Sequence, residues 1–424
     1  MKILWVKAGG LIPPDTGGKI RSYQLLRQLA AKHEVTLFTF YPAHPHDAHD
    51  ELEREGVRVV RQPLETPAPR SLGEIGLYAR QLFSLQPYSI TKYCRPEVAL
   101  RLRQLLQAEK YDLILCDFLC AAGVIPWDLG CPKVLFTHNV EALIWQRHSR
   151  VARNPVWKAV CWREYKTMAR AERHYLGLAD HVLTVSDTDR NHFTQFIDSS
   201  RMTVIPTGVD VDYYGLTSEP VEPNTLVFTG AMDWMPNEDG MFHFLEKILP
   251  RIRKQIPEVS LWIVGRQPSR RLQELAARTP GVRVTGTVED IRPYVHRAAV
   301  YVVPLLVGSG TRLKIFEAMA MGKAVVSTSL GAEGLPVRNG ENVILADEPE
   351  SFANAVVLLL QSSELRNNLG RAAREFVEHK YSWAFVAAEL EAILAIVARA
   401  GRIQKLVHSS PASKDCQSRT KLRE

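Results

Sequence analysis

The segment VPLLVGSGTRLKIFEAMAMG, residues 303–322, carries the strongest structural signal in the sequence. An apolar run ends at Pro304, a loop rich in glycine follows, and an amphipathic pattern begins near Arg312. This order predicts a buried strand, a glycine loop and a helix, which together form the repeating unit of a parallel α/β sheet.

The same alternation of short apolar runs and helical patterns continues along most of the 424 residues. A first series predicts strands over residues 3–7, 35–40, 57–61, 113–116, 134–137, 181–185 and 203–206, with helices over 20–32, 96–109 and 157–178. A second series predicts strands over 225–229, 260–264, 282–285, 300–303 and 324–327, with helices over 239–255, 269–278 and 313–321. Helices over 349–361, 364–378 and 383–401 close the chain. The runs lack polar alternation, as strands covered on both faces do.

Two doubly wound α/β domains follow from this pattern. Residues 206–224 are rich in Pro, Gly, Asp and Thr and predict a linker. We therefore predict a first domain over 1–207, a second over 208–382, and a basic, disordered tail over 402–424. Ligands of such paired domains bind where the carboxyl ends of the strands face a shared cleft.

Composition excludes several classes of protein. The chain has 53 Lys and Arg against 46 Asp and Glu, a net charge of +7, of which residues 401–424 carry +4. A basic tail favours solvated disorder, or contact with an anionic membrane, over a nucleic-acid arm. No run of 18 apolar residues and no signal peptide pattern occurs, and the six cysteines lack metal-ligand spacing. We expect a cytoplasmic protein with reduced thiols and peripheral contact at the inner face of the membrane.

The loop before the predicted helix 313–321 contains groups that suit a diphosphate. Ser309 or Thr311 can cap the helix, whose N-terminal amides carry a positive dipole end. Arg312 and Lys314 add two cations, and Glu317 lies five residues into the helix, within reach of hydroxyls near that phosphate. The alternative is an ordinary capped helix with solvated basic side chains.

A second glycine-rich loop follows the first predicted strand. Gly9 and Gly10 precede LIPPDT, and Gly17 and Gly18 open the next helix. Bare backbone at a strand-to-helix turn allows close approach of a ligand, although this spacing does not match a dinucleotide fingerprint. A loop without ligand is the alternative.

Several segments, taken in order, resemble retaining GT-B glycosyltransferases of family four. The carriers of the resemblance are PPDTGGKIRSYQLLRQLA, FTHNVEAL, VSDTDRNHF, VIPTGVDVDYY, FTGAMDWMPNEDG and GSGTRLKIFEAMAMGKAVVSTSLGAEGL. The resemblance spans roughly residues 1–400 and implies a GT-B fold of two Rossmann-like domains, with the helix over 383–401 packing back on the first domain. It implies a nucleotide sugar held mainly by the second domain, an acceptor held mainly by the first, and transfer with retained configuration.

Site residues follow from the same resemblance. Glu317 matches the glutamate expected to bind the donor ribose, and His138 matches the histidine near the transferred sugar. We assign catalytic roles to His138, Arg312, Lys314 and Glu317. We assign donor-binding roles to Gly17, Gly18, Gly230, Arg266, Gly308, Ser309, Gly310, Thr311 and Glu317.

Two departures from the family pattern matter. Ser309 stands where the family has the first of two glutamates, and no basic residue follows the first strand of the second domain. Arg312 and Lys314, with Arg266, are our candidates to supply the missing positive charge.

The predicted chemistry needs no metal and no cofactor beyond the donor. Asp210 and Asp212 mimic a metal-binding pair, but their place in the predicted linker favours a turn. Without a nucleophilic carboxylate, front-face substitution assisted by the leaving phosphate is favoured over double displacement. Alternatives are a GT-B nucleotide-sugar epimerase, a glycan phosphorylase, and a non-catalytic partner in glycan assembly.

Overall fold

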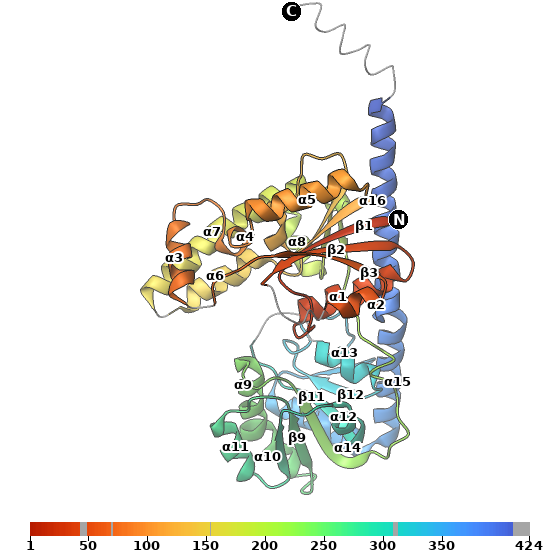
Figure 1. The fold of residues 1–424 in the computed structure, drawn as a ribbon. Coiled ribbons are helices and arrows are strands. Elements are labelled where there is room, and N and C mark those ends of the chain that lie inside the picture. Colours follow the sequence, from red (N-terminus) through yellow and green to blue (C-terminus); the bar gives the residue numbers. More distant parts are fainter. Residues whose placement is uncertain (43–48, 69–70, 153, 308–312, 410–424) are drawn as a thin grey trace, which may run out of the picture. The chain divides into compact units, whose positions relative to one another are not determined.

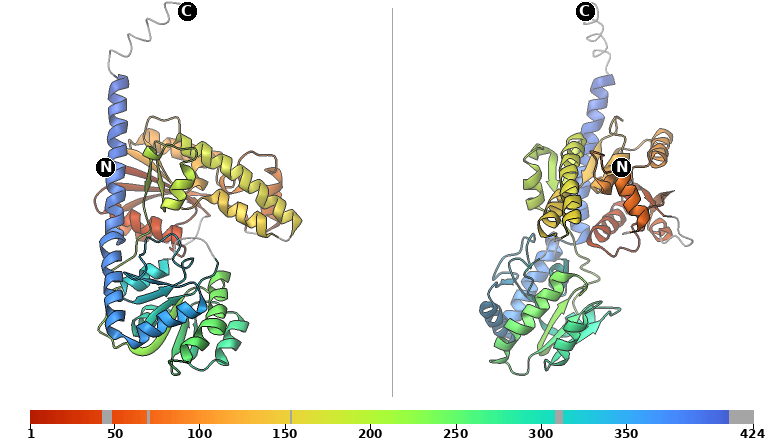
Figure 2. Two further views of the ribbon diagram at one scale, coloured as in Figure 1. Left: turned by 180° about the vertical axis from the view of Figure 1, so that it is seen from behind. Right: turned by 90° about the vertical axis from the view of Figure 1, so that its left-hand side faces the viewer.

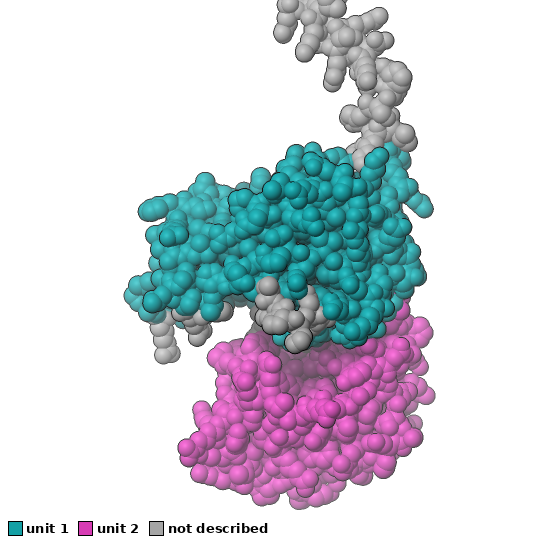
Figure 3. Space-filling view, viewed as in Figure 1, with its two compact units in different colours: residues 1–206, 387–424 teal, residues 207–386 magenta. Residues whose placement is uncertain are grey.

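The computed structural model describes residues 1–42, 49–68, 71–152, 154–307 and 313–409. The chain forms two compact units (Figure 3). Unit 1 consists of residues 1–206 together with the chain from Ala387 onward, and unit 2 consists of Thr207–Val386. Each unit has its own parallel sheet and its own apolar core.

Unit 1 is built on a parallel seven-stranded sheet with the order β3-β2-β1-β4-β5-β6-β7 (Figure 1). The strands are β1 (Lys2–Ala8), β2 (Glu34–Tyr41), β3 (Val57–Pro63), β4 (Leu113–Asp117), β5 (Lys133–Phe136), β6 (His181–Thr184) and β7 (Met202–Val204). Its helices are α1 (Gly17–Ala30), α2 (Asp50–Arg54), α3 (Leu72–Arg80), α4 (Tyr88–Thr91), α5 (Pro96–Ala108), α6 (Glu141–Val151), α7 (Pro155–Leu178) and α8 (Asp187–Phe193), with a 3₁₀ turn η1 (Leu119–Val124). The central strands are buried along their length because helices cover both faces.

Unit 2 contains a parallel six-stranded sheet with the order β10-β9-β8-β11-β12-β13. The strands are β8 (Glu222–Thr229), β9 (Ser260–Val264), β10 (Val282–Gly286), β11 (Ala298–Val303), β12 (Ala324–Ser327) and β13 (Ile344–Leu345). Its helices are α9 (Met235–His243), α10 (Leu249–Arg253), α11 (Arg270–Ala277), α12 (Arg292–Arg297), α13 (Leu313–Ala320), α14 (Pro349–Gln361) and α15 (Ser363–Lys380). The predicted class, two doubly wound α/β domains, is confirmed.

The predicted helix over 239–255 differs in detail from the structure. A π-helical segment, Phe244–Ile248, separates α9 from α10. Pro250, the second residue of α10, has no N–H to donate to the preceding turn, which accounts for the break in the regular α-helix.

The predicted linker over 206–224 is partly built into unit 2, which corrects that expectation. Val209 forms a bridge with Ser382. The Arg374 guanidinium donates to the carbonyl oxygens of Val211 at 3.0 Å and Tyr214 at 3.2 Å. These contacts fix the first half of the segment against α15.

The long C-terminal helix α16 (Trp383–Ser409), drawn in blue in Figure 2, belongs to unit 1 from Ala387 onward. Glu391 accepts a hydrogen bond from Lys32 at 3.0 Å and pairs with His33 at 3.1 Å. Arg402 pairs with Asp112 at 2.6 Å. Residues 402–409, which we predicted as part of the disordered tail, instead continue α16, and residues 410–424 lie outside the described part of the chain. None of the described helices is long and apolar enough to cross a membrane.

Candidate active site

Two glycines bring the loops after β8 and β9 into direct contact in unit 2. The Gly230 amide donates to the Val264 carbonyl at 2.9 Å. A Cβ on Gly265 would lie 1.8 Å from the Gly230 carbonyl oxygen, and one on Gly230 would lie 2.7 Å from Lys314 Nζ. Only residues without a side chain allow this approach, so the two loops pack backbone against backbone at the carboxyl ends of the strands.

Lys314 places its cation at the carboxyl end of β8. Its Nζ donates to Asn237 Oδ1 at 2.7 Å and lies 4.2 Å from the centroid of the Phe228 ring. Asn237 is buried and donates in turn to the Ala231 carbonyl at 2.8 Å. The positive charge that the β8 loop lacks in sequence is therefore delivered to that loop by α13.

Glu317 lies one turn further along α13 and contacts a residue that the sequence did not predict. The Tyr214 hydroxyl donates a hydrogen bond to the Glu317 carboxylate. Burial raises the pKa of Glu317, and this hydrogen bond and Lys314 oppose the rise. Tyr214 comes from the predicted linker, where nothing in the local sequence indicates such a contact.

The remaining residues of unit 2 that we predicted to bind the nucleotide-sugar donor fall into two groups. Arg266 is exposed after β9, with its Nε 3.7 Å from Asp233 Oδ1. Gly308, Ser309, Gly310, Thr311 and Arg312 lie outside the described residues. The roles assigned to all of them stay predictions.

His138 is buried in unit 1, at the carboxyl end of β5. Its Nε2 lies 2.6 Å from Asp117 Oδ1 and its Nδ1 lies 2.7 Å from a guanidinium nitrogen of Arg21. The ring stacks on Phe118 at 3.7 Å and packs against Phe136 at 4.5 Å. Burial lowers the pKa of His138 to about 4, although Asp117 opposes this change. The imidazole is therefore neutral at pH 7, with Nε2–H donating to Asp117 and Nδ1 accepting from Arg21. The predicted contact with a sugar stays a prediction.

Asp117 is the centre of a buried network that the sequence analysis missed. Its Oδ2 accepts hydrogen bonds from Lys7 Nζ at 2.9 Å, Ser22 Oγ at 2.6 Å and Trp5 Nε1 at 3.1 Å. Burial alone would raise the pKa of Asp117, but Lys7 and His138 outweigh it and hold the pKa below its ordinary value. The only sign of this network in the local sequence was that Asp117, an acidic residue, directly follows the predicted buried strand over 113–116.

Gly17 and Gly18 begin α1 beside this network. A Cβ on Gly18 would lie 2.4 Å from the Phe118 ring, so the glycine makes room for that ring. Phe118 has a φ of 68°, a backbone conformation that side chains rarely adopt. Packing against Gly18 and stacking on His138 hold the strained residue in place.

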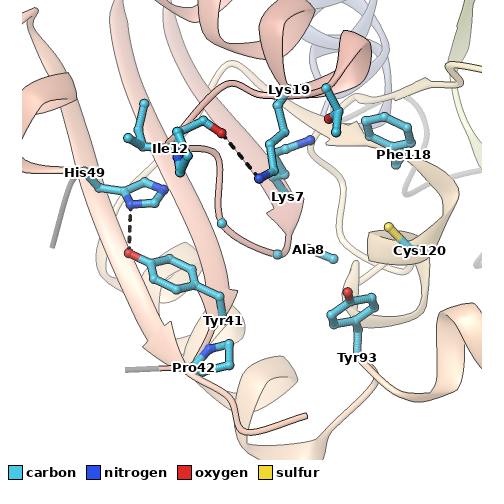
Figure 4. Close-up of a pocket in the computed structure, with 14 residues that line it drawn as sticks. Lys7, Ala8, Ile12, Lys19, Tyr41, Pro42, His49, Tyr93, Phe118 and Cys120 are labelled. Carbon is cyan, nitrogen blue, oxygen red and sulfur yellow. Dashed lines mark hydrogen bonds between the residues drawn. The ribbon is translucent and has the colours of Figure 1, made fainter. Parts of the chain in front are cut away.

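A pocket of about 620 Å³ opens in unit 1 at the carboxyl ends of β1 and β2 (Figure 4). Lys7 and Phe118 connect its wall to the Asp117 network. His49 accepts from the Leu11 amide at 3.0 Å through Nε2 and contacts the Tyr41 hydroxyl at 3.0 Å through Nδ1. The remaining lining residues are Ala8, Gly9, Gly10, Ile12, Pro13, Thr16, Lys19, Pro42, Tyr93 and Cys120. The pocket combines aromatic and apolar walls with a few fixed polar groups, as small-molecule sites do.

The acidic pair Asp210 and Asp212 lies in a turn, as predicted. The Asp210 carboxylate accepts from the Tyr213 amide at 2.9 Å, and the Asp210 carbonyl accepts from the Tyr214 amide at 2.9 Å. Within the described ranges, no three His, Cys, Asp or Glu side chains cluster in a way that suits a metal ion.

Comparison with family models decides the family. Residues 16–213 match the model described as Glycosyltransferase Family 4, and residues 223–362 match the model described as Glycosyl transferases group 1. The chain belongs to glycosyltransferase family four. The two matches cover most of unit 1 and most of unit 2.

Curated relatives of this family-four chain include a phosphatidyl-myo-inositol mannosyltransferase of Mycolicibacterium smegmatis. It is 31% identical over 228 residues, which are 52% of this chain and 58% of that relative. The chain thus spans less than two thirds of its length. An uncharacterized 44.6 kDa protein in the cps region of Klebsiella pneumoniae is 21% identical over 90% of this chain and 96% of its own length.

Solved structures of low identity share the fold. HepE from Anabaena in complex with UDP has a TM-score of 0.65 and 15% identity, covering 93% of this chain and 100% of that one. Sucrose-phosphate synthase from Thermosynechococcus elongatus has a TM-score of 0.67 and 19% identity, covering 94% and 100%. These likenesses support the GT-B fold of this family-four member.

Proposed function

We propose that this chain is a retaining glycosyltransferase that moves a sugar from a nucleoside-diphosphate sugar to a glycan or lipid-linked acceptor. The proposed setting is exopolysaccharide or cell-surface glycan synthesis. The observation that carries the proposal is that Lys314 lies beside Gly230 at the carboxyl end of β8, with Glu317 one turn further along the same helix.

The donor would bind to unit 2 through complementary chemistry. The Lys314 ammonium group, which lies beside Gly230, would supply a cation for the phosphate oxygens. Glu317 keeps acceptor capacity beyond its bond from Tyr214, because a carboxylate has about four lone-pair positions. Hydroxyls of a ribose are suitable donors for it. Arg312 and Arg266 are the proposed additional cations.

The acceptor would bind to unit 1 in the pocket described above. Tyr41 and Tyr93 present aromatic surface, against which the apolar faces of sugar rings pack, and Lys19 supplies a polar group.

Transfer would proceed by departure of the nucleoside diphosphate, whose growing negative charge Lys314 and Arg312 would stabilise. His138 would not act as a nucleophile, because its ring is buried and both nitrogens have partners within the chain. It contacts a sugar only by exchanging one of those two hydrogen bonds.

The comparisons support the general part of this proposal, which is glycosyltransferase activity. A curated relative is a mannosyltransferase, another lies in a cps region, and a structural neighbour was solved with UDP.

The test is incubation of the purified chain with UDP- and GDP-sugars and lipid-linked or glycan acceptors, with the product configuration read by NMR. A product whose anomeric configuration matches the donor is expected. Free epimer without acceptor would replace the proposal with an epimerase, and nucleotide binding without turnover would indicate a non-catalytic partner.

We also propose that the basic tail contributes to contact with an anionic membrane. The tail carries a net charge of +4, and each basic residue near such a surface adds about 1 kcal/mol. A chain ending at Ala400 is expected to sediment less with anionic vesicles at low salt. Equal sedimentation would refute the role of the tail.

A further inference from the structure

One end of unit 1 exposes large apolar side chains on α3, on the turn after it and on the start of α7. We call Leu72, Phe83, Leu85, Val156, Trp157 and Trp162 the apolar end of unit 1. Phe83 is 93% exposed, Leu72 86% and Val156 74%. Figure 1 shows α3 and the α6–α7 hairpin at this end, and the right-hand view of Figure 2 looks onto it. Water therefore contacts side chains that gain stability when they are buried.

No described residue of α3 is buried, and the first buried residue of α7 is Cys161. Helix α3 and the first turn and a half of α7 therefore contribute little to the core of unit 1. The segment is nevertheless held in place. Arg163 donates to the carbonyl oxygens of Leu82 at 2.9 Å and Ser84 at 2.9 Å. Glu164 accepts from the Tyr78 hydroxyl at 3.2 Å and from the Tyr88 amide at 2.9 Å.

The hairpin that presents these side chains is strongly basic. Residues 147–166 contain six Lys and Arg residues and a single acidic one, Glu164, a net of +5 against +7 for the whole chain. Lys158, Trp162 and Lys166 follow one another at four-residue spacing, so they share one face of α7. All three are exposed, and Lys166 Nζ lies 5.7 Å from the Trp162 ring.

We infer that the apolar end of unit 1 is a docking surface for an anionic lipid bilayer. Its apolar side chains would enter the boundary between headgroups and acyl chains, and the surrounding cations would bind lipid phosphates. The inference deepens the proposed function. It rests on that function in one respect, which is that docking at this surface would bring the enzyme to a lipid-linked acceptor.

Charge and side-chain type favour a lipid surface over a protein partner. Tryptophan and long basic side chains combine an apolar body with a polar end, as the interface of a bilayer requires. A second copy of this chain would bring a second +5 hairpin against the first, and like charges repel. An anionic bilayer instead attracts each basic residue with about 1 kcal/mol, which is about fivefold in binding.

The test is sedimentation of the full chain with vesicles of phosphatidylcholine alone, or with one third phosphatidylglycerol, at low and high salt. We expect binding to the anionic vesicles at low salt only. The double variant Lys158→Glu, Lys166→Glu should bind at least about thirtyfold less, because two attractive charges are lost and two repulsive ones are gained. Phe83→Ser should also weaken binding, since a fully exposed side chain can be changed without loss of core packing.

Matched controls lie in unit 2. Lys254→Glu reverses an exposed charge and Leu358→Ser removes an exposed apolar side chain, and both should bind vesicles as the unchanged chain does. The inference is overturned if the unit 1 variants bind as well as these controls. It is also overturned if sedimentation velocity shows that Phe83→Ser dissociates a dimer while vesicle binding is unchanged. Because this assay needs neither donor nor acceptor, its failure leaves the proposed transfer reaction untouched, and calorimetry with nucleotide on the same variants separates the two.

Discussion

Cations lie at the carboxyl ends of strands in both units, but their partners differ. In unit 1, Lys7 contacts Asp117, a carboxylate that is completely buried. In unit 2, Lys314 contacts the amide oxygen of Asn237, which is neutral. Arg266 in unit 2 lies 3.7 Å from an exposed carboxylate.

This difference indicates different tasks. The charges in unit 1 compensate one another inside the protein, so they stabilise the floor of a pocket with largely apolar walls. Lys314 is hydrogen-bonded to a neutral amide and also stabilises the Glu317 carboxylate, and we expect the same cation to act on an anionic diphosphate. The comparison predicts that substitutions of these charged residues in unit 1 mainly lower the stability of the fold. Substitutions in unit 2 should mainly affect donor binding and turnover.

The largest effect is expected for Asp117→Asn. The variant keeps the shape of the side chain but leaves Lys7 buried without its compensating charge. Breaking a buried pair in this way costs about 3–5 kcal/mol of unfolding free energy, measured by urea denaturation. Asp128→Asn is the control, because its pair with Arg103 at 3.0 Å is exposed and should contribute less than about 1 kcal/mol. If the two variants are equally stable, the Asp117 network does not stabilise unit 1.

A large effect on turnover is expected for Arg312→Ala and Lys314→Met. Both cations are proposed to act as the diphosphate gains charge, so turnover at saturating donor should fall more than binding does. Loss of one such stabilising group lowers turnover by roughly a hundred- to a thousandfold. Lys247→Met, an exposed change elsewhere in unit 2, should retain full turnover. Normal turnover of Arg312→Ala would show that the diphosphate is held elsewhere.

A smaller effect concerns pH and His138. Its pKa is lowered to about 4 by burial, against about 6.5 in the unfolded chain, so the unfolded chain binds the proton more readily. This contribution to stability is present above pH 6.5 and is lost as the pH falls towards 4. Between pH 7 and pH 5 the loss is about 2 kcal/mol. His138→Gln cannot titrate, so its stability should fall by about that much less over the same interval. Parallel pH profiles would show that His138 is not the titrating group.

The smallest effect is expected for metal removal. The acidic pair at Asp210 and Asp212 is used in a turn, and the reaction as proposed relies on protein cations. Turnover should therefore be unchanged in EDTA. Complete loss in EDTA, with recovery on addition of Mn²⁺ or Mg²⁺, would contradict this prediction.

The fold could be predicted because its signals are local. Buried parallel strands appear as apolar runs and their helices as amphipathic segments, each visible within about ten residues. The exceptions lack such a signal. Helix α3 contains Gly73 and Gly76 and buries no residue, so neither propensity nor periodicity marked it. The strand β13 has only two residues.

The site could be predicted only where its residues lie on one segment. Lys314 and Glu317 share α13, and their spacing is visible in the sequence. Their partners are not visible in the sequence. Asn237 is 77 positions away from Lys314, and Tyr214, the partner of Glu317, lies in the segment that we predicted to be a linker. In unit 1, Arg21 and His138 are 117 positions apart. Contacts of this kind arise from strand order, which single residues do not encode.

The most direct test of the account is calorimetric titration of the chain and of Glu317→Gln with UDP and GDP, alongside steady-state kinetics. The account predicts that the unchanged chain binds at least one nucleoside diphosphate. Glu317→Gln should bind it about ten- to a hundredfold more weakly, because a charged hydrogen bond worth roughly 1.5–3 kcal/mol is lost. If the unchanged chain binds neither nucleotide, unit 2 is not a donor site for these nucleotides. If Glu317→Gln binds normally yet does not turn over, the glutamate acts on the sugar and the assignment of Glu317 to the ribose is wrong.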